Sequence, residues 1–147
     1  MIALNSKKCI VIKDDGAPIG APAYQVSCAD APGEKWALLP ADPAAAPRNA
    51  GDRVFYIRNA VSNMCLESSD AERTFGDATQ VVQRRCDASD AQRWILRVLG
   101  QRADSLDVVF MGPRRKGCLN IIGESTANGA YVVRWPCHEL YQTRSSK

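Results

Sequence analysis

Six cysteines are the residues whose type and spacing point most clearly to chemistry. They stand at Cys9, Cys28, Cys65, Cys86, Cys118 and Cys137. Six cysteines can bind metal, react as thiols or pair as three disulfides, and three disulfides allow fifteen pairings. No Cys-x-x-Cys occurs and the chain has a single histidine, which argues against a zinc site. We therefore expect disulfides, no metal and no cofactor; six buried thiols in a cytosolic protein is the alternative.

Catalytic groupings are weak by comparison. The carboxylate pairs Asp14–Asp15 and Asp87/Asp90 lie in turn-like segments, where aspartate normally serves turns and helix caps. The sequence contains no Gly-rich phosphate loop and no Ser/His/Asp pattern above chance. We expect a protein that is not an enzyme.

An internal repeat organises the chain. The central unit reads Cys65-Leu66-Glu67, then a polar loop with Gly76, then an apolar run before Cys86, and then Gln92-Arg93-Trp94. The N-terminal unit repeats this order, with Gly20 and Tyr24-Gln25-Val26 before Cys28 in the place of Gly76 and Gln80-Val81-Val82 before Cys86. Glu34 and Trp36 follow Cys28 at the offsets of Gln92 and Trp94 from Cys86. The C-terminal unit keeps both cysteines, but its last triplet has decayed.

This self-similarity indicates three units of about 45 residues. We place them at about 1–42, 53–98 and 106–147 of one domain that spans 1–147. Equivalent cysteines should make equivalent bonds, so the repeat selects the pairs Cys9–Cys28, Cys65–Cys86 and Cys118–Cys137.

Strand signals dominate the sequence. Short β-branched or aromatic runs alternate with Gly, Pro, Asn and Asp clusters, while no window of eleven or more residues has sustained helical periodicity. Four strands in each of three units predict an all-β fold of about twelve strands. Single helical turns are expected at Asp30–Glu34 and Asp87–Gln92, capped by Asp or Ser. Trp36 and Trp94 recur in phase with the repeat and are expected in the core.

Composition limits the other classes. The chain has 147 residues, 46% of them hydrophobic, and a net charge of +3. This mild charge argues against a nucleic-acid-binding protein, and no apolar run approaches the roughly 20 residues of a membrane span. The disulfides favour secretion. The N-terminus has no basic-then-apolar signal pattern, so a signal was either removed or never present.

The succession of Cys-Leu, Gly, Val, Cys and Gln-x-Trp, three times over, resembles the ricin B-chain type β-trefoil lectins. The resemblance covers essentially the whole chain, and the phrase from Tyr56 to Glu67 is similar to small bacterial lectins of this group. It implies a six-stranded barrel capped by three hairpins, with a shallow sugar site possible in each lobe. Family members act as agglutinins or as the targeting part of a toxin or glycosidase.

In the family, an acidic residue two places after the first Cys and an aromatic platform two places before the second Cys hold the sugar. The first lobe has Val11 and Val26 at these positions, so we expect no site there. The second lobe has Glu67 but Arg84 as its platform, a pair that would neutralise itself.

The third lobe is the best candidate. Trp135 stands at the platform position and Asn120 at the acid position, with His138, Gln142 and Arg134 as further candidates. Trp135 could instead be a hydrophobic plug, because Tyr131, Val133 and Trp135 would share one strand face. The basic cluster Arg114-Arg115-Lys116 suggests sulfated or otherwise acidic sugars beside the galactose of the family; a plain charged surface is the alternative.

A lectin is therefore the leading interpretation. The alternative is a degenerate trefoil that binds protein, or serves as a toxin-accessory subunit or a partner of an enzyme chain, without binding sugar.

Overall fold

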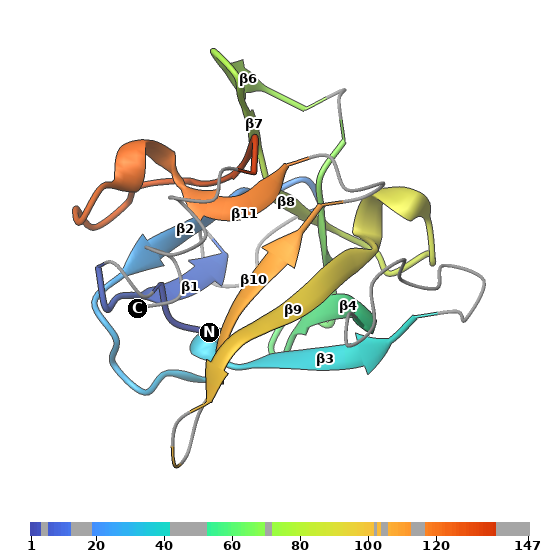
Figure 1. Cartoon of the computed structure of the whole chain (residues 1–147), viewed down its shortest axis with the longest axis horizontal. Helices are drawn as coiled ribbons and strands as arrows, with labels where there is room; N and C mark the ends of the chain where they lie inside the picture. The colour runs from blue at the N-terminus through green and yellow to red at the C-terminus, as the bar shows by residue number, and fades with distance from the viewer. Residues whose placement is uncertain are drawn as a thin grey trace.

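The computed structural model describes residues 1–3, 6–12, 19–41, 53–69, 72–101, 103, 106–112 and 117–137. Within these ranges the chain forms twelve strands and three short 3-10 helices, so the predicted all-β fold is confirmed (Figure 1). The predicted sites at His138 and Gln142 lie outside the described residues, as do Asp14–Asp15 and the basic cluster 114–116. No helix in the described part of the chain is both long enough and apolar enough to cross a membrane.

The strands divide unevenly among three lobes, each of which is defined here by its cysteine pair. The first lobe holds β1 (Cys9–Ile12), β2 (Ala23–Val26) and β3 (Trp36–Pro40). The second holds β4 (Arg53–Asn59), β5 (Cys65–Glu67), β6 (Thr74–Phe75), β7 (Ala78–Gln80), β8 (Val82–Arg84) and β9 (Trp94–Gln101). The third holds β10 (Leu106–Met111), β11 (Cys118–Ile121) and β12 (Val132–Trp135).

Pairing between strands is antiparallel throughout the described sheets. β1 and β2 form one two-stranded sheet, and ten strands form the other in the order β6-β7-β12-β11-β10-β9-β4-β5-β8, with β3 added on β4. The long hairpin of β9 and β10 crosses the front of the molecule in Figure 1, while the short hairpin of β6 and β7 stands clear of the rest. The third lobe thus meets the second both through β10 and β9 and through β12 and β7.

The three disulfides join the pairs that the repeat predicted, Cys9–Cys28, Cys65–Cys86 and Cys118–Cys137. In each lobe the first cysteine faces the residue two places before the second cysteine across the strand pair. The three register pairs are Cys9 with Val26, Cys65 with Arg84, and Cys118 with Trp135. The lobes are therefore superimposable in register as well as in cysteine spacing.

Three buried apolar residues join the lobes through backbone hydrogen bonds. Ala23, Val81 and Val132 each lie five residues before the second cysteine of their lobe, and none has any exposed surface. The backbone N–H of Ala23 donates to the carbonyl of Val81 at 3.0 Å, and the N–H of Val81 donates to that of Val132 at 3.1 Å. These bonds satisfy buried backbone groups that would otherwise be costly, and they connect the three lobes directly.

The two repeat tryptophans anchor their lobes by the same bond. The indole N–H of Trp94 donates to the carbonyl of Leu66 at 3.1 Å, and that of Trp36 donates to the carbonyl of Ile10 at 2.9 Å. Trp94 is completely buried in the main core cluster, whereas Trp36 is partly buried against it. Each ring fills apolar volume and still satisfies its polar N–H.

The expected helical turns are present as the 3-10 helices η1 (Pro32–Glu34) and η3 (Asp90–Gln92). The expectation that Asp or Ser side chains cap them was wrong, because neither helix has a side-chain cap hydrogen bond. Instead, Glu34 Oε2 accepts from the backbone N–H of Ala29 at 2.8 Å, and Gln92 Oε1 accepts from that of Asp87 at 3.1 Å. The side chains of Glu34 and Gln92, the residues two places before each repeat tryptophan, thus hydrogen-bond to the backbone five residues earlier.

A buried glutamine in β2 ties the first lobe to the third. Gln25 is fully buried; its Nε2 donates to the carbonyls of Ser125 and Ala127 at 3.0 and 2.8 Å, and its Oε1 accepts from Ser6 Oγ at 2.8 Å. The strand registers align Gln25 with the equally buried Gln83, three places before the second cysteine, and not with Gln80.

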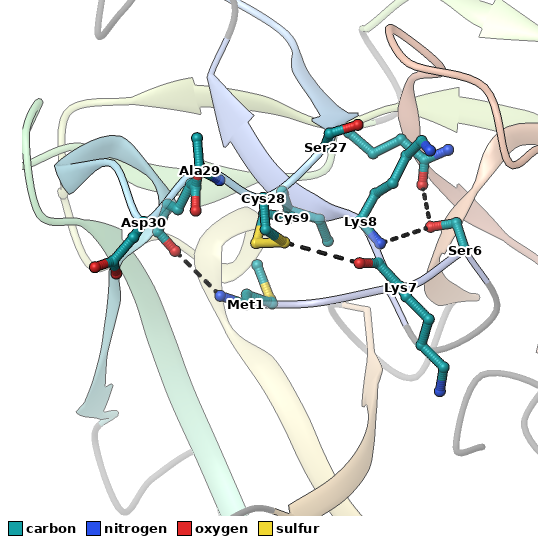
Figure 2. The surroundings of a disulfide bond; sticks show 12 residues. Met1, Ser6, Lys7, Lys8, Cys9, Ser27, Cys28, Ala29 and Asp30 are labelled. Atoms are coloured by element: carbon teal, nitrogen blue, oxygen red, sulfur yellow. Dashed lines mark hydrogen bonds between the residues drawn. A yellow bond between two sulfur atoms is a disulfide. The ribbon is translucent and has the colours of Figure 1, made fainter.

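A backbone segment just before the first cysteine contacts the disulfide of its lobe, as Figure 2 shows for Cys9–Cys28. The Sγ atom of Cys28 lies 3.8 Å from the carbonyl oxygen of Lys7, and Cys86 lies 3.7 Å from that of Asn63 in the second lobe. Lys7 and Asn63 both adopt positive φ, at 62° and 58°. The same backbone bend therefore precedes the first cysteine in both lobes.

Candidate functional site

Strand register puts the two predicted sugar-binding positions of each lobe on one face. In the third lobe Cys118 lies opposite Trp135 and Asn120 lies opposite Val133. Directly opposed residues share a sheet face, and alternate residues along a strand share it too. Asn120 and Trp135 are thus diagonal neighbours, and the other two lobes repeat the arrangement.

The first lobe offers only apolar side chains at these positions. Val11 and Val26 are both half-buried, and Val11 faces Tyr24 across the strand pair. Neither valine can accept a hydrogen bond from a sugar hydroxyl or present a flat ring to its C–H face.

The second lobe holds a closed ionic cluster. Arg84 Nε lies 3.1 Å from Glu67 Oε2, and a terminal nitrogen of Arg84 lies 2.7 Å from Glu72 Oε2. The hydrogen bond to Glu72, followed by the charges of Glu72 and Glu67, raises the pKa of Arg84 above its usual range. The guanidinium is therefore protonated and neutralised by two carboxylates. The sequence did not identify Glu72 as a partner of Arg84, because the two residues are 12 positions apart and only the loop conformation brings them into contact.

Both carboxylate oxygens of Glu67 are engaged. Oε2 faces Arg84, while Oε1 accepts a hydrogen bond from Gln92 Nε2 at 3.2 Å. Gln92 also donates to the carbonyl of Arg85 at 2.8 Å and is fully buried. Because each oxygen of Glu67 already has a partner within the protein and the side chain is largely buried, a sugar hydroxyl would have to compete with these partners.

The third lobe differs from the second because its platform residue is an aromatic side chain that is partly exposed to solvent. Trp135 is partly exposed, whereas Val133 on the same face is fully buried. Asn120 is also partly exposed; its Oδ1 accepts from the backbone N–H of Ile121 at 2.8 Å, which leaves the Nδ2 group without a partner among the described residues. The face therefore combines an accessible indole with an amide donor.

Arg134 lies on the other side of this strand pair. It faces Leu119 on β11 and Thr79 on β7, and it donates to Thr79 Oγ1 at 3.4 Å. Strand alternation thus separates Arg134 from Trp135, and the structure does not bring these two predicted residues together. Arg134 occupies the position of Gln25 and, like it, makes a contact between lobes.

Sequence reasoning did not find an aromatic cluster that is formed by the β6–β7 hairpin and the residue just before β12. The rings of Phe75 and Tyr131 stack with centroids 5.9 Å apart and an interplanar angle of 19°. The guanidinium carbon of Arg73 lies 5.0 Å from the centroid of Phe75. One signal was available: the cysteines of the second lobe are 21 residues apart, against 19 in the other two.

Possible metal ligands gather at one place in the described residues. Sγ of Cys9, Sγ of Cys28 and a carboxylate oxygen of Glu34 lie within 4.8 Å of one another. Both sulfurs belong to the disulfide, so the group offers no thiolate and does not fit a metal site.

Comparison with known proteins agrees with this architecture. The sequence profile of the family described as "Ricin-type beta-trefoil lectin domain-like" matches residues 44–135, which is more than half of the chain. No curated protein matches the sequence.

Solved structures share the fold at low sequence identity. A designed 3-fold symmetric protein, ThreeFoil, has 19% identity and a TM-score of 0.75, with 99% of this chain and 91% of that chain covered. The Rhizoctonia solani agglutinin has 11% identity and a TM-score of 0.64 over 99% and 87% of the two chains. A mosquitocidal holotoxin has 13% identity and a TM-score of 0.68 over 95% of this chain and 15% of that chain.

Proposed function

Because this chain belongs to the ricin-type β-trefoil lectin family, we propose that it is a carbohydrate-binding protein whose third lobe holds the sugar on Trp135. The observation that carries this proposal is the partly exposed indole diagonal to Asn120 on one sheet face. An aromatic ring stacks on the apolar C–H face of a sugar, while an amide hydrogen-bonds its hydroxyls. A shallow site needs both, since either contact alone is too weak in water.

The composition of the first and second lobes supports a single sugar-binding site, located in the third lobe. The first lobe lacks both groups, and in the second the acidic residue is occupied by Arg84 and Gln92. Weak affinity per site follows, because one ring and one amide bury little ligand surface. Galactose is the family's usual sugar; the asparagine in place of the acid makes other neutral or acidic sugars equal candidates.

The same features favour a secreted, non-catalytic module. Three disulfides are stable in an oxidising compartment. The carboxylates of the best-formed polar cluster, Glu67 and Glu72, are both paired with Arg84, so neither is placed to act as a general acid or base on a bound glycoside. The chain would serve as a binding unit, alone or beside a partner chain.

One observation favours a second candidate, a trefoil that binds protein or accompanies a toxin without binding sugar. No lobe presents an uncommitted acid at the position two places after its first cysteine: the residues there are Val11, the engaged Glu67 and Asn120. A protein-binding trefoil would give a blank glycan array together with the specific capture of a defined partner chain.

The test is a glycan array with three variants of the third lobe. Trp135→Ala should abolish glycan signal and leave the melting temperature nearly unchanged, because the ring is only partly buried. Trp135→Phe keeps an aromatic face and should retain part of the binding. Asn120→Asp keeps the oxygen that accepts from Ile121 and adds a carboxylate, so it should strengthen binding of neutral sugars.

Two results would contradict the proposal. A large loss of stability in Trp135→Ala would identify the ring as a hydrophobic plug. Unchanged glycan binding in the same variant would move the site elsewhere in the molecule.

A further inference from the structure

The β6–β7 hairpin extends the sheet that carries Trp135. Phe75 pairs with Ala78 across this hairpin, and Gln80 on β7 pairs with Val133 on β12. Because paired residues and alternate residues share a face, Phe75 lies on the same face as Val133. The face of β6, β7, β12 and β11 that bears Trp135 and Asn120 therefore continues onto the second lobe.

Aromatic contact confirms this shared face. Tyr131, the residue just before β12, and Trp135, the last residue of β12, lie on either side of Val133, and the ring of Tyr131 stacks on Phe75. Tyr131 and Trp135 are four positions apart in the sequence, a span of about 13 Å for extended backbone. Three aromatic residues thus line one face over a length greater than a single sugar ring.

Arg73 places a positive charge beside the ring of Phe75. It is exposed, its guanidinium stacks over Phe75, and its backbone carbonyl is fixed by the N–H of Gln80 at 2.8 Å. None of the ion pairs between described residues involves Arg73, whereas Arg84 is bound by two carboxylates. A guanidinium over a ring face can still direct its N–H donors to a bidentate anion such as a sulfate or a carboxylate.

We propose that Arg73, Phe75 and Tyr131 form an anion-accepting subsite, so that the ligand is an oligosaccharide bearing a sulfate or carboxylate rather than a single neutral sugar. This inference rests on the proposed function, since Trp135 would hold one sugar unit while Arg73 receives the charge of another. The second-lobe loop, which is two residues longer between its cysteines than the other two, contains Arg73 and Phe75; the corresponding stretches 10–19 and 119–128 contain neither an arginine nor an aromatic residue.

Isothermal titration with a matched ligand pair tests the subsite. The probes are a sulfated galactose-containing tetrasaccharide and the same tetrasaccharide without sulfate. Wild type should bind the sulfated form about tenfold more tightly, as expected for one charge-assisted contact. Arg73→Gln should remove this preference and leave the affinity for the neutral form unchanged. Phe75→Leu, which removes the stacking surface, should reduce the preference in the same way.

Arg53→Gln is the matched control. Arg53 is exposed on β4, which is separated from β11 by β10 and β9 in the sheet. The Arg53→Gln variant loses the same charge as Arg73→Gln and should keep the preference for sulfate. This result would exclude a simple effect of net charge. Far-ultraviolet circular dichroism of each variant checks that the overall β fold is kept.

The outcomes separate the two proposals. Equal affinity of wild type for both probes, or a preference that survives Arg73→Gln, overturns the subsite and leaves the lectin proposal standing. Sulfate-dependent binding that needs Arg73 but tolerates Trp135→Ala supports the subsite and overturns the Trp135 platform. No binding of either tetrasaccharide by wild type overturns the subsite as proposed, and a blank glycan array in addition overturns the proposed function.

Discussion

Gln92 donates a hydrogen bond from Nε2 to Oε1 of Glu67 at 3.2 Å, and both side chains are buried. Gln92 opens the Gln-x-Trp box, which belongs to the fold, while Glu67 stands at the acid position of a candidate site. In the second lobe, therefore, one hydrogen bond joins the residue that shapes the loop to the residue that would bind a sugar.

Replacing Gln92 by glutamate should destabilise the protein. Gln92→Glu removes the donor to the Arg85 carbonyl and places a second carboxylate against Glu67. Leaving buried partners unsatisfied costs about 1–3 kcal/mol, and charge repulsion adds to this. The free energy of unfolding in urea would show the loss. Glu34→Gln is the control: Glu34 Oε2 only accepts from Ala29 in this contact, so an amide oxygen can replace it. Equal losses in the two variants would show that Gln92 acts through loop shape alone.

Giving the second lobe an aromatic platform should create a new sugar site. Arg84→Trp puts a ring diagonal to Glu67 and removes the cation that occupies Oε2. Binding stoichiometry should rise from one to two sites per chain by calorimetry. Val26→Trp adds the same ring to the first lobe, where Val11 supplies no polar partner, and should add no site. If Val26→Trp binds as well as Arg84→Trp, a ring alone suffices and the polar residue is dispensable.

Gly117 supports the third lobe by close approach of two strands. A Cβ at this position would lie 2.7 Å from Arg134 Cγ and 2.8 Å from the carbonyl oxygen of Trp135, and φ is +75°. Gly117→Ala should cost about 1–3 kcal/mol and should also weaken glycan binding, because the carbonyl that must move belongs to Trp135. Gly76→Ala has a similar φ of +63° with nothing near the new atom. It should therefore show only the smaller backbone cost, in thermal melting and in titration alike.

The repeat made most of the architecture predictable. Cysteine spacing predicted the three disulfides, and the phase of Trp36 and Trp94 predicted core positions, which Trp94 occupies fully and Trp36 partly. Sequence also identified Glu67 and Arg84 as a self-neutralising pair. These features depend on contacts within one lobe, and such contacts recur with the sequence of that lobe.

Contacts between lobes were not predictable in the same way. The stack of Phe75 on Tyr131 joins residues from two lobes, and nothing in either local sequence points to the other. Backbone conformation was equally hidden: Asp30 and Ala88, each two places after a second cysteine, share positive φ values of 55° and 61°. Alanine rarely adopts this region, so only the surrounding fold can impose it.

Each disulfide closes a loop inside its own lobe, and none links one lobe to another. A lobe copied, exchanged or moved along the gene by circular permutation would thus carry its covalent bond with it. The mutual arrangement of the lobes then depends on weaker, replaceable contacts such as those of Gln25 with Ser125 and Ala127. Such a division leaves each lobe free to gain or lose a binding face in evolution while its neighbours keep the barrel intact.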